Sequence, residues 1–84
     1  MIERNIQVLA GLEARPAALF DQTASQFISS VYLMMDSKTI NAKSIMGIIS
    51  LGVIDGQNVT IIAEGPDEEQ AVDKLEKFLS DVNT

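Results

Sequence analysis

Apolar residues near the N-terminus alternate with polar ones, which is the period of a half-buried β-strand. Ile2, Ile6 and Val8 hold the apolar positions, and Arg4 occupies a position on the same inward side of this strand. Three further segments have the composition of strands, and a tight turn is expected between the first two of them. These segments are 31–35, 39–41 and 58–63.

Helical spacing follows the first strand. Phe20, Ala24 and Phe27 recur at intervals of four and three residues after Pro16, so we expect a helix from Pro16 to about Phe27. A second, short helix is expected over 45–51, with the side chain of the preceding serine as its N-cap. Because a helix this short is marginal alone, it must depend on tertiary packing.

The clearest periodic pattern predicts a third helix near the C-terminus. Asp67 and Gln70 have the spacing of a capping box at its start. The order β-α-β-β-α-β-α predicts an α+β fold, with one face of a sheet packed on helices and the other open to water. Residues 1–84 are expected to form a single domain, since the chain is too short for a second core. The apolar stripe of the third helix comprises Ala71, Val72, Leu75, Phe78, Leu79 and Val82.

Composition excludes several classes of function. The 84 residues include no cysteine and no histidine, so a disulfide framework, a thiolate or imidazole metal site and a phosphohistidine are ruled out. The formal net charge of −6 repels nucleic acids and anionic lipids. No apolar segment approaches the roughly 20 residues that span a bilayer, and the N-terminus lacks the pattern of a signal peptide. We therefore expect a cytoplasmic protein that uses no metal or cofactor.

Two junctions between a loop and a helix are candidates for chemistry. At 11–17, Glu13 and Arg15 lie two residues apart at a helix start, where free N–H groups favour anions, although spacing alone favours a solvated ion pair. At 41–47, spacing alone makes Ser44 a helix cap and leaves Ile45 and Met46 as either core or surface residues.

These two segments, in this order, resemble those of HPr, the small phosphocarrier protein of the bacterial sugar phosphotransferase system. The resemblance extends from Ile6 to Leu79, and the run Asn-Ala-Lys-Ser-Ile-Met-Gly at 41–47 is its most specific part. It implies an HPr-like open-faced sandwich, in which three helices cover one face of a four-stranded antiparallel sheet. It also implies a protein that is not an enzyme.

Glu13 stands where the family has its phosphorylated histidine, which relays phosphate from enzyme I to a component of a sugar transporter. A carboxylate replaces an imidazole poorly as a reversible phosphoryl acceptor, and no histidine elsewhere in the chain takes over the role. The connection between the first strand and Gly11 is also shorter than is usual in the family. Both departures indicate that phosphocarrier activity has been lost.

Ser44 matches the serine that HPr kinase/phosphorylase phosphorylates with ATP in low-GC Gram-positive bacteria. The modified protein is then a corepressor of the catabolite-control transcription factor. The subfamily called Crh keeps this serine and lacks the histidine, and this chain is similar to it in that logic. The leading hypothesis is therefore a regulatory protein of carbon catabolite repression that is phosphorylated on Ser44. Residues implied to bind the phosphate or a partner are Arg15, Lys43, Ile45 and Met46.

Other hypotheses stay open. Glu13 could act as a fixed negative charge that imitates phosphohistidine for a metabolic enzyme or regulator. An acyl phosphate on Glu13 would instead make the chain a degenerate phosphocarrier, a route that elsewhere needs a site built for metal-assisted transfer. Crh-like members also exchange their first strand between protomers, so the resemblance implies that a domain-swapped homodimer can form.

Overall fold

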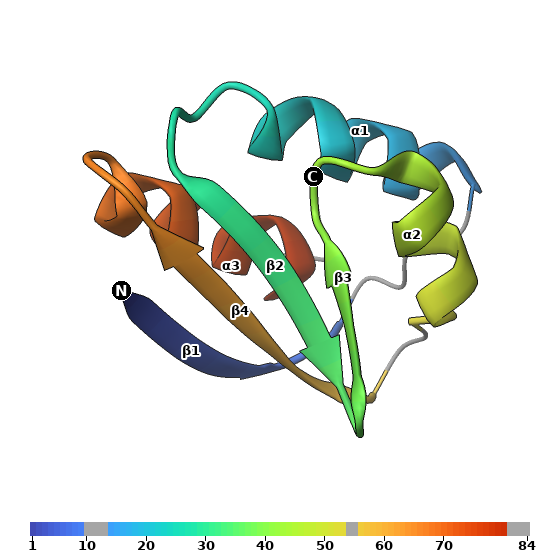
Figure 1. The fold of residues 1–84 in the computed structure, drawn as a ribbon. Coiled ribbons are helices and arrows are strands. Elements are labelled where there is room, and N and C mark those ends of the chain that lie inside the picture. The colour runs from blue at the N-terminus through green and yellow to red at the C-terminus, as the bar shows by residue number, and fades with distance from the viewer. Residues whose placement is uncertain (10–13, 54–55, 81–84) are drawn as a thin grey trace.

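A computed structural model describes residues 1–9, 14–53 and 56–80, with the backbone alone at 14 and 15. The predicted order β-α-β-β-α-β-α is confirmed (Figure 1). The elements are β1 (Ile2–Gln7), α1 (Ala14–Ala24), β2 (Ser30–Met35), β3 (Lys38–Asn41), α2 (Ile45–Leu51), β4 (Asn58–Glu64) and α3 (Glu68–Ser80).

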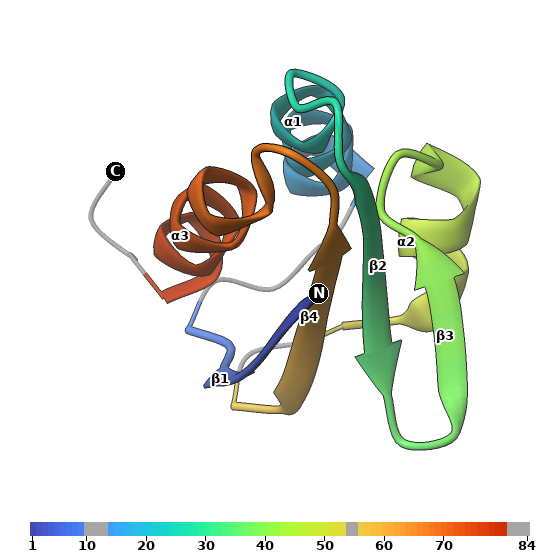
Figure 2. The same ribbon diagram turned by 60° about the vertical axis from the view of Figure 1, so that its left-hand side comes forward.

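The four strands form one antiparallel sheet in the order β1-β4-β2-β3. The helices lie together on one face of this sheet, and the other face is uncovered (Figure 2). Strand β4 is buried at every second residue, at Val59, Ile61 and Ala63, as expected for a central strand with one face on the core. The predicted α+β open-faced sandwich is therefore confirmed.

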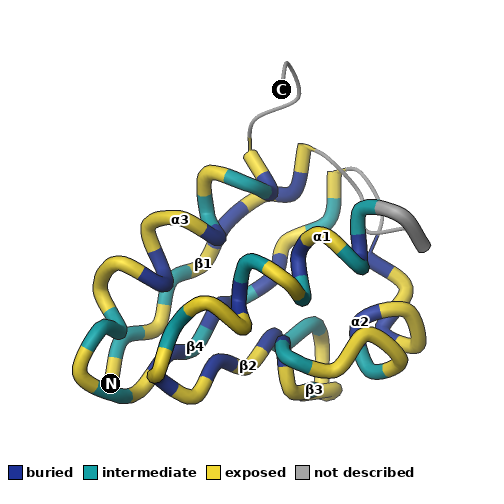
Figure 3. The backbone as a smooth tube through the Cα atoms, turned by 90° about the horizontal axis from the view of Figure 1, so that it is seen from above, coloured by how far each residue is buried: buried dark blue, intermediate teal, exposed yellow. Residues whose placement is uncertain are grey.

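The core fills the space between the sheet and the helices, where the buried residues of the two layers face each other (Figure 3). Helix α3 contributes four buried residues of the predicted stripe, while Phe78 is partly buried and Val82 lies outside the described residues. The Phe78 ring packs edge-to-face on Phe20 of α1, with 5.5 Å between ring centroids. Such a pair adds about 0.5–1.5 kcal/mol beyond the area it buries. The four buried residues are Ala71, Val72, Leu75 and Leu79.

Helix α1 differs from the prediction at both ends, because it begins at Ala14 and ends at Ala24 instead of continuing to about Phe27. After Ala24 the chain tightens into turns, in which the N–H groups of Gln26 and Phe27 donate to carbonyls three residues back, both at 3.2 Å. Phe27 still packs against the core, which explains why its spacing resembled that of a helix. Apolar periodicity therefore continued past the last helical hydrogen bond.

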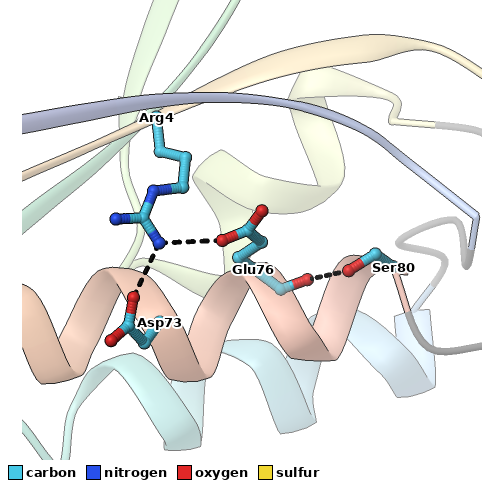
Figure 4. A network of polar contacts seen from close by, with 4 residues as sticks. All are labelled: Arg4, Asp73, Glu76 and Ser80. Carbon is cyan, nitrogen blue, oxygen red and sulfur yellow. Dashed lines mark hydrogen bonds and ion pairs between the residues drawn. The ribbon is translucent and has the colours of Figure 1, made fainter.

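Arg4 faces inward, as the alternation indicated, yet its guanidinium is satisfied by α3. Its Nη1 lies 2.6 Å from a carboxylate oxygen of Asp73 and 2.8 Å from one of Glu76 (Figure 4). The Ser80 hydroxyl donates to the Glu76 carbonyl one turn further along the helix. Because β1 is an edge strand, a long charged side chain on its inner face reaches past the core to α3.

The predicted capping box of Asp67 and Gln70 is wrong. The Asp67 carboxylate instead accepts hydrogen bonds from the backbone N–H of Ile28 at 3.0 Å and from the N–H and hydroxyl of Ser29. The Ser29 hydroxyl, followed by the Ile28 N–H, lowers the pKa of Asp67 because these bonds favour the charged carboxylate. Asp67 thus joins the β4–α3 connection to the α1–β2 connection, 38 residues away along the chain.

Candidate phosphorylation and docking site

Ser44 is the N-cap of α2, as predicted. Its backbone is extended, with φ −115° and ψ 111°, and its Oγ accepts a hydrogen bond from the Gly47 N–H at 3.2 Å. Its carbonyl accepts the Ile48 N–H at 3.0 Å, which starts the helical hydrogen bonds. The side chain of Ser44 is nevertheless exposed, so the hydroxyl can be reached from solvent. A hydroxyl that accepts one bond still has its own proton to donate.

The segment before Ser44 is held in place by successive hydrogen bonds. The Ala42 N–H donates to the Val31 carbonyl at 2.9 Å, and the Ala42 side chain is fully buried. Asn41 then accepts twice, because its Oδ1 takes the Lys43 N–H at 2.8 Å and its carbonyl takes the Ser44 N–H at 3.0 Å. Such local side-chain bonds fix a turn conformation. Ser44 is therefore presented by an ordered connection.

Lys43 points its ammonium group back toward the end of α1. Its Nζ donates to the carbonyl oxygen of Phe27 at 2.8 Å, across 16 residues of sequence. The side chain is partly buried along this path. Spacing alone could not reveal this contact, because it joins the β3–α2 connection to the turns that follow α1.

Ile45 and Met46 are both exposed, at 37% and 73% of their surface. The core interpretation of Met46, which spacing left open, is therefore wrong. Ile49, one turn further along α2, is exposed at 42%. These three residues define the α2 apolar patch. Ile49 was missed from the sequence, and its signal was the i, i+4 spacing from Ile45, which places the two side chains next to each other on the helix surface.

The first candidate junction falls largely outside the described part of the chain. Glu13 lies beyond the described residues, and Arg15 is described only as backbone in the first turn of α1. Their roles at the position of the family's histidine therefore remain predictions. Among residues 1–9, 14–53 and 56–80, no group of acidic side chains is arranged to hold a metal ion. Within the same ranges, no helix is long and apolar enough to cross a membrane.

The antiparallel sheet order and the three helices on one face define an HPr-like fold, and Ser44 is an exposed cap of α2 within it. Residues 2–81 match the family model described as the PTS HPr component phosphorylation site. The chain belongs to the HPr family, whose members are phosphocarriers or regulators rather than enzymes.

Individual relatives include both branches of this family. The chain is 48% identical to the HPr-like protein Crh of Bacillus subtilis over 83 residues, which cover 96% of this chain and 98% of Crh. Its structure resembles the phosphocarrier protein HPr from Bacillus anthracis with a TM-score of 0.91 and 44% identity, covering 94% and 96% of the two chains. It resembles crystalline Crh from Bacillus subtilis, a domain-swapped dimer, with a TM-score of 0.78 and 49% identity, covering 94% and 93%.

Proposed function

We propose that this protein is a Crh-like regulator of carbon catabolite control in the cytoplasm. HPr kinase/phosphorylase phosphorylates Ser44, and the phosphorylated protein is a corepressor of the catabolite-control transcription factor. One observation carries the proposal, namely the exposed Ser44 hydroxyl beside the exposed side chains of Ile45 and Met46. The likeness to Crh at 48% identity supports the regulatory role.

The chemistry required of Ser44 is modest. Its Oγ attacks the γ-phosphorus of ATP, the bond from that phosphorus to the β,γ-bridging oxygen breaks, and ADP leaves. The hydroxyl proton passes to a base of the kinase. The product carries about 1.5–2 additional negative charges next to the α2 apolar patch. A partner with a basic pocket beside an apolar surface would distinguish this form from the unmodified protein, because Met46 offers an adaptable contact.

The absence of histidine from all 84 residues supports a regulator over a phosphocarrier. A phosphoryl relay through the family's usual imidazole has no acceptor in this chain. The resemblance to the family places Glu13 at the corresponding position, and a carboxylate forms a reactive acyl phosphate only in sites built for that chemistry. We therefore expect enzyme I and phosphoenolpyruvate to leave the protein unmodified.

Intact-mass spectrometry tests the proposal directly. Incubation with ATP, magnesium and an HPr kinase/phosphorylase should add one phosphate to the wild-type protein. Ser44→Ala should abolish the addition, and it should cost only about 1 kcal/mol of stability because it removes a cap and leaves the core intact. Ser50→Ala is the matched control, since Ser50 is an exposed serine of the same helix whose hydroxyl bonds to the Gly47 carbonyl. An unchanged wild-type mass, or a phosphate supplied by enzyme I, would refute the regulatory proposal.

We also infer that two copies of the chain can exchange β1. This strand lies at the edge of the sheet and pairs with β4 over the register from Ile2↔Ala63 to Gln7↔Asn58. An exchanged β1 would make the same pairs with β4 and the same Arg4 ion pairs, but with the partner molecule. The free energy of dimer formation would therefore depend mainly on the segment that connects β1 to α1. Size-exclusion chromatography with light scattering should detect a dimer whose fraction rises with concentration. A monomer at all concentrations would contradict this inference.

A further inference from the structure

Lys43 precedes the proposed phosphorylation site, and its ammonium group is bound within the protein. We propose that Lys43 is a positioning residue, which ties the segment presenting Ser44 to the end of α1 and so fixes the hydroxyl for phosphoryl transfer. This inference rests on the proposed phosphorylation of Ser44. It departs from the expectation that Lys43 binds the phosphate or a partner directly.

The end of α1 lacks a cation of its own. No basic residue occupies its last turn, and the chain continues in tight turns as far as Phe27. Carbonyl groups at a helix C-terminus and in the turns beyond it carry partial negative charge and need donors. The Lys43 ammonium supplies one at 2.8 Å from the Phe27 oxygen. A charged donor makes this hydrogen bond stronger than a neutral one.

The same residue is held at its backbone. The Lys43 N–H donates to Asn41 Oδ1 at 2.8 Å, so the residue is fixed at its main chain and at the tip of its side chain. The next peptide N–H, that of Ser44, donates to the Asn41 carbonyl at 3.0 Å. Because Lys43 is the residue before Ser44, a shift of its backbone would change the position from which Ser44 enters α2. Phosphoryl transfer is sensitive to such shifts because the attacking oxygen must lie in line with the bond that breaks.

A direct contact with the kinase would require a different orientation of the Lys43 side chain. The ammonium would have to face solvent, whereas it is directed to a backbone carbonyl in a partly buried environment. An exposed lysine that steers a partner acts through long-range charge, which salt screens. A short, partly buried hydrogen bond is screened less. The two roles therefore predict different dependences on ionic strength and different kinetic parameters.

Steady-state phosphorylation of Lys43→Met separates these roles. Methionine keeps an apolar stem of similar length and removes the ammonium. We expect kcat to fall about tenfold with KM nearly unchanged, because the hydroxyl is misplaced while the docking surface remains. The reduction should be the same at about 0.05 and about 0.5 M salt. Lys43→Arg should recover most of the rate, since a guanidinium can donate to the same carbonyl.

Lys38→Met is the matched control, because Lys38 is an exposed lysine at the start of β3 and its loss changes the net charge equally. Circular dichroism confirms that each variant is folded, and Lys43→Gln replaces Lys43→Met if the latter is not. Kinetics of Lys43→Met equal to those of Lys38→Met would overturn the inference. So would a raised KM that depends on salt, since it would assign Lys43 to the kinase interface. If the wild-type protein accepts no phosphate, the proposed function fails instead.

Discussion

Replacing Gly65 with alanine should be among the most damaging small substitutions in this protein. Gly65 has a φ of +151°, a conformation that L side chains rarely adopt. A Cβ added at this position would lie 2.5 Å from the Ser29 Oγ and 2.6 Å from the Ser29 Cα. Ser29 cannot move aside easily, because it is buried and its hydroxyl is bound to Asp67. The substitution therefore combines a strained backbone with a clash against main-chain atoms.

The destabilisation can be estimated for the backbone strain and for the clash separately. An unfavourable φ at a non-glycine residue costs about 1–3 kcal/mol, and inserting a methyl group into a packed contact costs typically about 1–3 kcal/mol more. We therefore expect Gly65→Ala to lower the free energy of unfolding by about 4 kcal/mol. In a domain of this size that corresponds to a fall in Tm of more than about 15 °C.

Gly52→Ala provides the control for this prediction. Gly52 also has a positive φ, of 71°, but no heavy atom lies within 4 Å of the position its Cβ would take. Its substitution should cost only the backbone term, about 1–2 kcal/mol. Urea unfolding followed by far-UV circular dichroism measures both variants. If Gly65→Ala destabilises the protein no more than Gly52→Ala, the clash with Ser29 is not present in solution and the reasoning fails.

Three further predictions concern pH, salt and the α2 apolar patch. The pKa of Asp67 is lowered in the folded state, so its contribution to stability is present above the ordinary pKa of a carboxyl and is lost as pH falls through the folded value. Asp67→Asn should therefore flatten the acid side of a plot of urea midpoint against pH, and an unchanged slope would contradict the assignment. Arg4→Met should lower the urea midpoint of unfolding at low salt, and its difference from wild type should shrink near about 1 M salt, where ion pairs are screened. Lys77→Met is the control, because it removes one positive charge and leaves Arg4 in place. Met46→Ala should change the free energy of unfolding by no more than about 0.5 kcal/mol, because Met46 is exposed. Ile48→Ala, at a fully buried position of the same helix, should cost about 2–5 kcal/mol. Similar costs for the two substitutions would contradict the exposure of Met46.

Features determined by neighbouring residues could be predicted from the sequence. The cap at Ser44 depends on an oxygen and an N–H three residues apart, and the α3 stripe depends on a repeat within one helix. The cap is confirmed, and the stripe is confirmed as far as Leu79, where the described part of the predicted set ends. The end of α1 was harder to predict, because the apolar spacing continues to Phe27 whereas the helix ends at Ala24 and its last hydrogen bond of the α-helical type is donated by the Ser25 N–H.

Features determined by distant residues could not be predicted. Arg4 meets Asp73 and Glu76 about seventy residues later, and nothing near Arg4 in the sequence indicates those partners. The spacing of Asp67 suggested a local cap, but two backbone N–H groups and a hydroxyl on another connection were available to it. Three hydrogen bonds to a carboxylate stabilise its charged form more than a single capping bond would.

The position of β4 at the centre of the sheet has a consequence for synthesis on the ribosome. Strand β1 is made first, but its partner in the sheet is β4, the sixth of the seven elements. The β2–β3 hairpin can form early, whereas β1 must wait with Ile2 and Ile6 unpaired until β4 has emerged. Under the exchange of β1 proposed above, the nascent chain would carry during that delay a free strand that the β4 strand of another copy could bind. Translation rate and the spacing of ribosomes on the messenger would then influence how many molecules begin as exchanged pairs.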